Sequence, residues 1–111
     1  MLLVDPGTHR ITDANPFMTE LLGYTREEFL ERGLCRIGLF QNEEACQAAF
    51  RELQEKCVFR DDNLTGQTKA GERRALELVG NLYEEAGRQV IQCNVRDITE
   101  RKQAEERLRL G

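Results

Sequence analysis

The sequence contains no tryptophan, two prolines, one histidine and no long run of apolar residues. A transmembrane helix needs about 20 consecutive apolar residues, so the sequence predicts no membrane span. Residues 1–4 are too short for a signal peptide and have no basic start, and we interpret them as a first strand. We therefore expect a cytoplasmic domain without direct membrane contact, cut from a longer protein. Any membrane anchor would belong to the other parts of that protein.

Several kinds of catalytic and metal site are also missing. The single histidine, His9, lies in a polar turn, where we expect it to be exposed to solvent, and there is no Cys-x-x-Cys pair. Structural zinc sites usually draw on such pairs, and nucleophilic catalysis usually needs a histidine beside the nucleophile. The nine glycines form no phosphate-binding loop. We predict no metal site and no catalytic residues, so the domain itself is not expected to be an enzyme.

The charge pattern argues against nucleic-acid binding. The chain has 16 basic and 20 acidic residues, a formal net charge of -4, and the two signs are interleaved. A nucleic-acid surface needs clustered basic residues, and the only adjacent basic pairs are at positions 73–74 and 101–102. We predict no nucleic-acid partner.

Four cysteines, at positions 35, 46, 57 and 93, are spread along the chain. Free cysteine is among the residues most often buried, and disulfides are rare in the cytosol. We therefore expect buried, reduced thiols.

Capping residues predict the helices of the first half. Asn15 and Pro16 start a helix that Gly23 stops, and Thr25 with Glu28 forms a capping box for the next one. Asn42 would cap the longest helix, at about 43–57. Its apolar residues recur at helical spacing and would form one buried face: Cys46, Ala49, Phe50, Leu53 and Cys57.

In the second half of the chain, apolar and polar residues alternate as they do in β-strands. After short strands at 2–4 and around Ile11, we predict strands at 64–68, 74–83 and 89–97. A four-residue turn at 84–87 would pair Tyr83 with Arg88 and Leu78 with Cys93. That register gives one apolar face, which contains Leu76, Leu78, Gly80, Leu82, Ile91, Cys93 and Val95.

The opposite face of this hairpin is mixed in character. Val79, Tyr83 and Val90 would lie on it beside polar residues. We interpret these three as a candidate dimer face; the alternative is simple exposure of isolated apolar side chains.

The segment 96–102 joins the last strand to a charged helix. Asp97 and Glu100 have the spacing of a capping box, with Thr99 as an alternative cap. A domain that ends in a polar helix is suited to passing a signal on. We predict that Asp97, Ile98 and Thr99 relay it, with the domain at 1–98 and the start of a signalling helix or linker at 99–111.

Four segments, residues 11–17, 22–28, 68–71 and 94–102, together resemble a PAS domain, the sensor-box module of bacterial two-component histidine kinases. The resemblance implies an α+β fold: a five-stranded antiparallel sheet of order 2-1-5-4-3, short helices on one face and a C-terminal exit helix. It also implies a sensing or relay role in a multidomain signalling protein, homodimerisation, and a downstream kinase or output domain in the same chain as partner.

PAS domains hold haem, flavin, small metabolites or no ligand. Cys35-Arg36 resembles the photoreactive pair of LOV flavin sensors, yet Cys35 lies one residue too far along and follows Leu34 instead of an asparagine. Haem in such domains is usually held by a histidine on the long helix, which has none here. We predict neither cofactor.

A cavity for a small molecule is the remaining hypothesis. Its walls would be Phe17, Leu22, Phe50, Leu53, Leu78 and Cys93. The alternative is that these side chains fill the core completely, which would leave a ligand-free interaction or dimerisation module.

Overall fold

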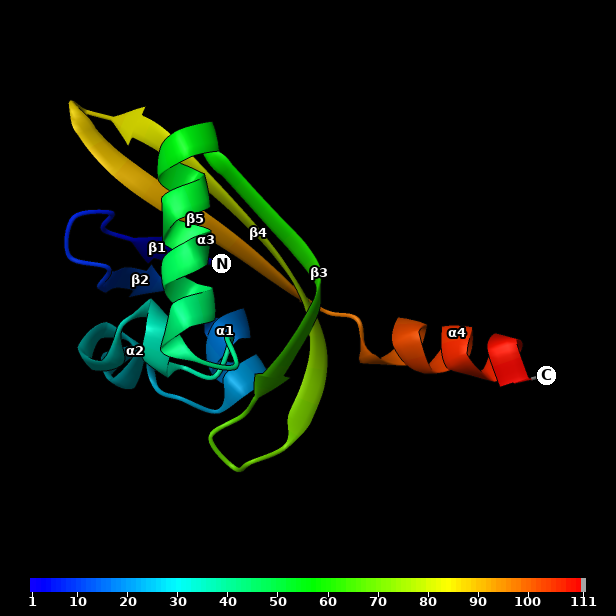
Figure 1. The fold of residues 1–111 in the computed structure, drawn as a ribbon. Coiled ribbons are helices and arrows are strands. Elements are labelled where there is room, and N and C mark those ends of the chain that lie inside the picture. Colours follow the sequence, from blue (N-terminus) through cyan, green and yellow to red (C-terminus); the bar gives the residue numbers. More distant parts are fainter. Residues whose placement is uncertain (111) are drawn as a thin grey trace.

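A computed structural model of the chain describes residues 1–110, with the side chains described as far as residue 107. It contains a five-stranded antiparallel sheet of order β2-β1-β5-β4-β3, as the resemblance to PAS domains implies. Helices cover one face of the sheet, and a last helix extends away from the body (Figure 1). The strands are β1 (Leu2–Val4), β2 (Ile11–Ala14), β3 (Val58–Gln67), β4 (Arg73–Glu85) and β5 (Arg88–Asp97).

The helices lie between β2 and β3, apart from the one that ends the chain. They are α1 (Pro16–Leu22), α2 (Arg26–Arg32), the 3-10 turn η1 (Leu34–Arg36), α3 (Glu43–Lys56) and α4 (Thr99–Leu110). The protruding α4 makes the molecule elongated, with extents of 53 × 30 × 24 Å. Among residues 1–110, no helix combines the length and the apolar character that crossing a membrane requires.

The predicted helix starts are confirmed. The side-chain oxygen of Asn15 accepts a hydrogen bond from the Met18 amide, and that of Asn42 accepts one from the Ala45 amide at 2.8 Å. The Thr25 hydroxyl accepts from the Glu28 amide at 3.2 Å, while the Glu28 carboxylate accepts from the Thr25 amide at 3.1 Å. These bonds satisfy amides that have no partner within a helix, which is why short polar residues set these boundaries.

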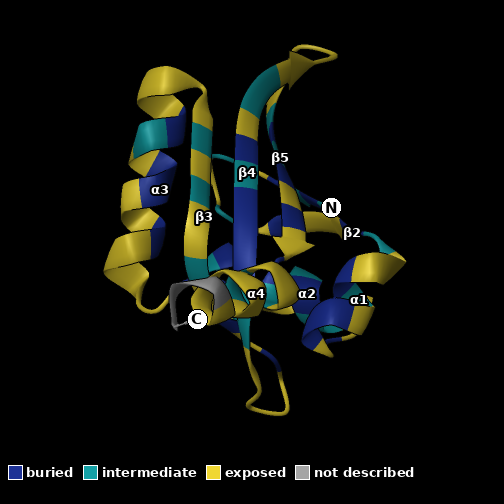
Figure 2. Cartoon of the chain, turned by 90° about the vertical axis from the view of Figure 1, so that its right-hand side faces the viewer, coloured by how far each residue is buried: buried dark blue, intermediate teal, exposed yellow. Residues whose placement is uncertain are grey.

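The core lies between α3 and the inner face of the sheet. Figure 2 shows buried bands along β4 and on the side of α3 that faces the strands. The apolar face predicted for β4 and β5 is confirmed, because Leu76, Leu78, Ile91, Cys93 and Val95 are all buried. Alternation along each strand places these side chains on one side of the pleat.

The predicted register of the last hairpin is wrong by two residues. The turn consists of Ala86 and Gly87 alone, and Glu85 pairs with Arg88. Both turn residues have positive φ, 51° and 79°, as in the tight turn that matches the twist of two antiparallel strands. Because the shift is even, every side chain keeps its predicted face. Leu78 therefore opposes Val95 instead of Cys93.

Strand β3 is longer than predicted, since it begins at Val58 directly after α3. Its pairing with β4 is interrupted by a bulge between Asp61 and Leu64. The interruption hides the period-two pattern that sequence reasoning relies on. The polar run Arg60 to Asn63 therefore lies within a strand, where a loop is the simpler expectation.

The expectation of four reduced, buried thiols is wrong for three cysteines. Cys35 and Cys46 form a disulfide, with their Cα atoms 5.6 Å apart. Cys57 is free but exposed, because α3 ends at Lys56 and Cys57 follows it with a φ of 63°. Cys93 is a free, buried thiol, as predicted.

The predicted exposure of His9 is also wrong. Its ring stacks on that of Phe50, with ring centroids 3.7 Å apart and planes 5° from parallel. The loop between β1 and β2 folds back onto α3 through this contact, which leaves His9 half-buried.

Candidate functional site

The end of β5 and the start of α4 are joined by a group of hydrogen bonds around Asp97. One carboxylate oxygen, Oδ1, accepts bonds from the Thr99 amide at 2.9 Å and from the Thr99 hydroxyl at 2.6 Å. The other oxygen, Oδ2, accepts a bond from Nη1 of Arg74 at 3.1 Å. Bonds between ions and polar groups are the stronger kind of hydrogen bond, so these contacts fix the direction in which the chain leaves the sheet.

The first residues of β4 hold the same segment from the other side. The Ala75 amide donates to the Thr99 hydroxyl at 3.1 Å, and the Ile98 amide donates to the Ala75 carbonyl at 2.8 Å. Ile98 is buried. We call this group the exit junction; it consists of Arg74, Ala75, Asp97, Ile98 and Thr99.

The predicted capping box of Asp97 with Glu100 is not the arrangement found. Asp97 is the last residue of β5, and α4 begins at Thr99. The Ile98 carbonyl accepts the first helical hydrogen bond, from the Lys102 amide at 2.9 Å. Ile98 is therefore the cap and Asp97 lies one position before it, with its two carboxylate oxygens bonded to Thr99 and Arg74.

Two opposing effects act on the Asp97 carboxyl. Partial burial alone would raise its pKa, while the hydrogen bonds from Thr99 and Arg74 stabilise the charged form and together outweigh burial. The pKa of Asp97 is therefore lowered from its ordinary value. The exit junction contains a carboxylate, not a carboxylic acid, at neutral pH.

A second charged cluster lies on the outer face of the sheet, beside the exit junction. The Glu77 side chain on β4 is only 8% exposed, and three guanidinium groups surround it. Arg60 of β3 lies 3.6 Å from it, Arg96 of β5 3.8 Å and Arg101 of α4 4.0 Å. A buried carboxylate needs such compensation. The first turn of α4 is therefore connected to the sheet in two ways, by the chain that leaves β5 and by the contact of Arg101 with Glu77.

Sequence reasoning placed Asp97, Ile98 and Thr99 in this region but missed Arg74 and Glu77. The signal for Arg74 was present in the strand alternation. In the predicted register Arg74 lies directly opposite Asp97. In the observed register Leu76 lies opposite Asp97, and Arg74 is two residues away on the same face of β4, still close enough to contact it. Glu77 directly opposes Arg96 in the observed register.

The predicted cavity walls lie in the core with one exception. Leu22, Phe50, Leu53, Leu78 and Cys93 are buried and belong to one continuous apolar cluster.

The exception is Phe17, which is wrongly placed by the prediction, since it is 46% exposed. Successive residues of a helix turn by about 100°, which centres Met18 between Leu21 and Leu22 on the buried side of α1. Phe17 falls at the edge of that side and faces outward.

The three residues of the candidate dimer face share the outer face of the sheet. Tyr83 directly opposes Val90, and Val79 lies four residues before Tyr83 on β4. All three are half-buried. Val58 of β3 lies on the same face, opposite Asn81, and is 44% exposed. The outer face therefore carries several apolar side chains without being uniformly apolar.

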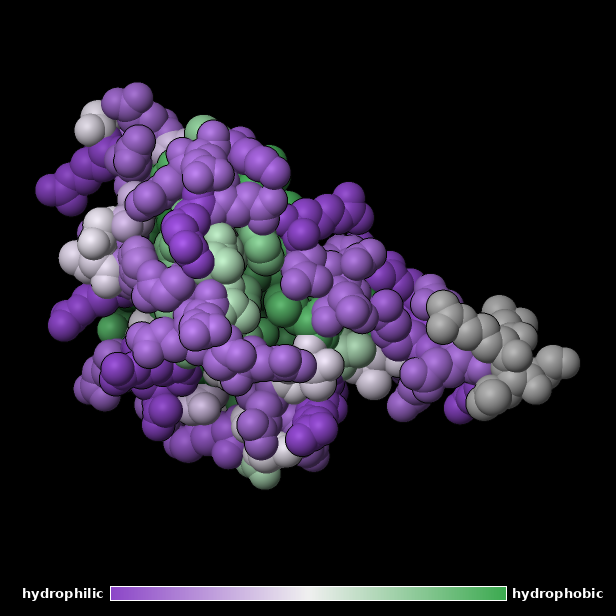
Figure 3. All heavy atoms as spheres, in the orientation of Figure 1, coloured by the Kyte–Doolittle hydropathy of each residue, from purple (hydrophilic) through white to green (hydrophobic). Residues whose placement is uncertain are grey.

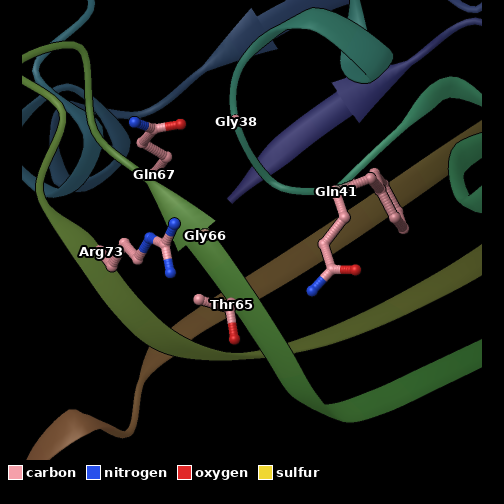
Figure 4. Close-up of a pocket in the computed structure, with 7 residues that line it drawn as sticks. Gly38, Gln41, Thr65, Gly66, Gln67 and Arg73 are labelled. Atoms are coloured by element: carbon pink, nitrogen blue, oxygen red, sulfur yellow. The ribbon is translucent and has the colours of Figure 1, made fainter.

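The surface on the helix side is mainly polar, with apolar atoms visible in the middle of this view (Figure 3). A hollow of about 260 Å³ lies where the loop before α3 meets the edge of β3. Figure 4 shows its polar side chains, which are Gln41, Thr65, Gln67 and Arg73. Within residues 1–110, no group of three or more histidine, cysteine, aspartate or glutamate side chains is arranged to hold a metal ion.

Comparison with solved structures finds the same fold in domains of other proteins. The PAS domain of the fruit-fly ELK potassium channel superposes with a TM-score of 0.73 at 18% identity, covering 88% of this chain and 85% of that one. The PAS domain of nitrogen regulation protein NR(II) from Vibrio parahaemolyticus gives 0.66 at 22% identity, covering 87% and 86%.

A domain of a sensory box sensor histidine kinase/response regulator from Geobacter sulfurreducens gives a TM-score of 0.68 at 22% identity, covering 86% of this chain and 80% of that one. A search of curated proteins gives no match. The sequence pattern of the PAS domain family matches residues 1–100, which is nearly the whole chain. The chain belongs to the PAS domain family.

Proposed function

We propose that this PAS domain senses or relays a signal within a multidomain signalling protein and passes it to a downstream output domain of the same chain. A sensor histidine kinase is the parent we favour, because several structural neighbours are domains of such kinases. The domain itself performs no catalysis in this proposal. Residues 1–98 form the sensor, and residues 99–111 begin the signalling helix; Gly111 lies outside the described residues.

The exit junction is the observation that carries this proposal. Asp97 and Thr99 connect the last strand to α4, while Arg74 and Ala75 connect the same two residues to β4. A small shift between β4 and β5 changes these bonds, and the bonds set the direction of α4. Such a change is transmitted when a packed element can switch between two discrete arrangements.

Regulated output of the full-length protein tests the proposal. Asp97→Ala and Thr99→Val are expected to uncouple output from the signal, while circular dichroism shows a folded domain in both variants. Thr12→Val, an exposed change on the edge strand β2 and outside the exit junction, is the control. Full regulation in both junction variants would refute the relay.

Self-association through the outer face is a second part of the proposal. Val79, Tyr83 and Val90 are only half-buried in the single chain, and a second copy would cover them. Light scattering is expected to show concentration-dependent association that Tyr83→Glu weakens. A strict monomer at all concentrations would contradict this part.

For the core, we propose a domain without haem or flavin. Cys35 is bonded to Cys46 and in this form offers no thiol for a flavin adduct. The purified protein is expected to show no visible absorbance. The five buried residues of the proposed cavity wall pack within one cluster, which favours a ligand-free interaction module as the alternative to a small-molecule sensor.

Thermal shifts across a metabolite library separate these two alternatives. A ligand that binds the folded state raises the melting temperature as it saturates the site. Such a shift would favour the sensor, while its absence across the library would favour the interaction module.

We also propose that the domain works in the cytosol. Cys57 is free and exposed, an uncommon state in oxidising compartments, where an unpaired surface cysteine is liable to form intermolecular bonds. Fractionation of cells that express the full-length protein, with the domain probed by proteases from either side of the membrane, tests the location.

A further inference from the structure

We propose that Cys35 and Cys46 form a redox centre that exchanges with small thiols, and that its state determines how firmly the segment between them is held on the domain. The proposal goes beyond the relay function and does not depend on it. The two cysteines join η1 to α3, eleven residues apart in sequence. The disulfide therefore closes a loop that contains the whole segment from residue 36 to residue 45.

The two sulfurs differ in their access to solvent. Cys46 is 0% exposed and belongs to the buried face of α3, whereas Cys35 is half-buried at the edge of the core. Thiol–disulfide exchange requires a thiolate to reach one sulfur along the axis of the bond. The burial difference directs attack to Cys35 and makes Cys46 the leaving group.

The surroundings of Cys35 favour an anionic reactant. Cys35 lines a hollow of about 350 Å³ between the β1–β2 loop, η1 and the start of α3. Three arginines line the same hollow, Arg10, Arg32 and Arg36, against two carboxylates, Glu31 and Glu43. Reactive cysteines are typically found in such partly exposed, electropositive surroundings. The chemical class that fits is a small thiol that carries carboxylates.

The exchange takes place in two steps. A small thiolate attacks Sγ of Cys35, the Cys35–Cys46 bond breaks, and the electron pair leaves with Sγ of Cys46, which takes up a proton. Cys35 then carries the small thiol as a mixed disulfide. A second thiolate attacks the sulfur of that bound molecule, releasing a small-molecule disulfide and Cys35, which is then protonated. Two small thiols are oxidised and the protein gains two electrons and two protons; the reverse reaction closes the bond.

The loop closed by the disulfide is attached to the sheet. Its Gly38 carbonyl accepts a hydrogen bond from the Gln67 amide at 2.8 Å, at the end of β3. Ile37, Leu39 and Phe40 on either side are buried in the core. Opening the disulfide leaves this segment held by packing and that hydrogen bond without the covalent closure, so its amides become more open to exchange.

The unmodified chain tests the proposal directly. After purification in air, alkylation of the unfolded chain without reductant is expected to label two cysteines, Cys57 and Cys93, and with reductant all four. The native chain is then equilibrated in mixtures of reduced and oxidised glutathione and quenched with acid. The expected results are reversible opening of the disulfide in the native chain, a transient glutathione adduct mapped to Cys35, and faster amide exchange in residues 36–45 after reduction.

Three results would overturn the proposal. They are four free thiols after air purification, a disulfide that opens only when the chain is unfolded, or an adduct mapped to Cys46. The variants Cys46→Ser and Cys35→Ser form a matched pair: glutathione disulfide is expected to modify Cys35 in the first at least about tenfold faster than Cys46 in the second. Because the adduct is also mapped in the unmodified chain, a variant that fails to fold does not remove the test.

The preference for an anionic thiol has its own test. Arg36→Gln is expected to slow the reaction with glutathione several-fold and to leave the reaction with neutral 2-mercaptoethanol unchanged. Equal slowing of both reactions, or no slowing of either, would contradict the assigned class of reactant. Cys57→Ser is the control, because Cys57 is outside the disulfide and the hollow.

Discussion

Replacing Gly38 with alanine tests how the loop before α3 is attached to the sheet. Gly38 has a φ of 81°, and a Cβ added to it would lie 2.1 Å from the Gln67 carbonyl oxygen, which belongs to rigid strand backbone. The left-handed conformation costs an alanine about 1–2 kcal/mol. Relieving the clash displaces the loop, and such overpacking costs about 1–3 kcal/mol. The displacement also breaks the hydrogen bond from the Gln67 amide to the Gly38 carbonyl, which contributes about 1 kcal/mol. We therefore expect the free energy of unfolding to fall by about 3–6 kcal/mol in total.

Gly87→Ala is the matched control. Gly87 has nearly the same φ, 79°, but nothing lies within 4 Å of its added Cβ. Gly87→Ala should lower the free energy of unfolding only by the cost of the left-handed conformation, about 1–2 kcal/mol. The effect of alanine on the unfolded chain is the same in both variants and does not alter the comparison. Urea unfolding followed by circular dichroism measures both losses. Equal losses at the two positions would refute the argument that Gly38 is required by close approach to β3.

Three further predictions concern thiol reactivity, a helix cap and acid stability. At pH 8 iodoacetamide should label the exposed Cys57 in the native chain and spare Cys93, because burial raises the pKa of Cys93 to about 12; comparable labelling rates would contradict its burial. Thr25→Ala should lower the free energy of unfolding by about 1 kcal/mol and Thr25→Ser by much less, and equal losses would show that the hydroxyl cap is unimportant. The folded-state pKa of Asp97 lies below that of the unfolded chain, about 3.9, so its stabilisation is present above that pH and is lost as pH falls through the folded pKa. The stability difference between the unmodified chain and Asp97→Asn should accordingly shrink below about pH 4, and a constant difference from pH 7 to pH 3 would be inconsistent with the bonds to the charged carboxylate.

Features set by neighbouring residues could be predicted from the sequence. Asn15, Thr25 and Asn42 mark helix starts because each side chain reaches the amide three residues ahead. The inner face of the hairpin was also predictable, because side chains alternate in a strand whatever its partner. These signals do not depend on distant contacts.

Features set by distant contacts were predicted poorly. The hairpin register depends on whether two or four residues form the turn, and the chain uses Ala86 with Gly87 instead of a more common turn pair. The disulfide depends on how η1 packs against α3, and the spacing of Cys35 and Cys46 contains no sign of that contact. Each depends on a packing arrangement that only the folded chain specifies.

The exit junction combines both kinds of feature. Asp97 and Thr99 are two residues apart, so their mutual bonds could be anticipated from sequence. Arg74 and Glu77 come from another strand, and their roles emerge only when β4 lies beside β5 and α4. Local chemistry thus identified where the site lies, and tertiary contacts supplied its remaining partners.

The central claim is that a change in the core reaches α4 through Thr99. A double-mutant cycle by hydrogen exchange tests this claim most directly, with the rate measured at the amides of the first turn of α4. Leu78→Val makes a small core change on β4, at a cost of about 1 kcal/mol, and Thr99→Val removes the hydroxyl that accepts from the Ala75 amide.

We predict that Leu78→Val accelerates exchange at the start of α4 when Thr99 is present and has little further effect in the Thr99→Val background. If the two substitutions act additively on that exchange rate, the core and the exit helix are not coupled through Thr99, and the relay account is wrong.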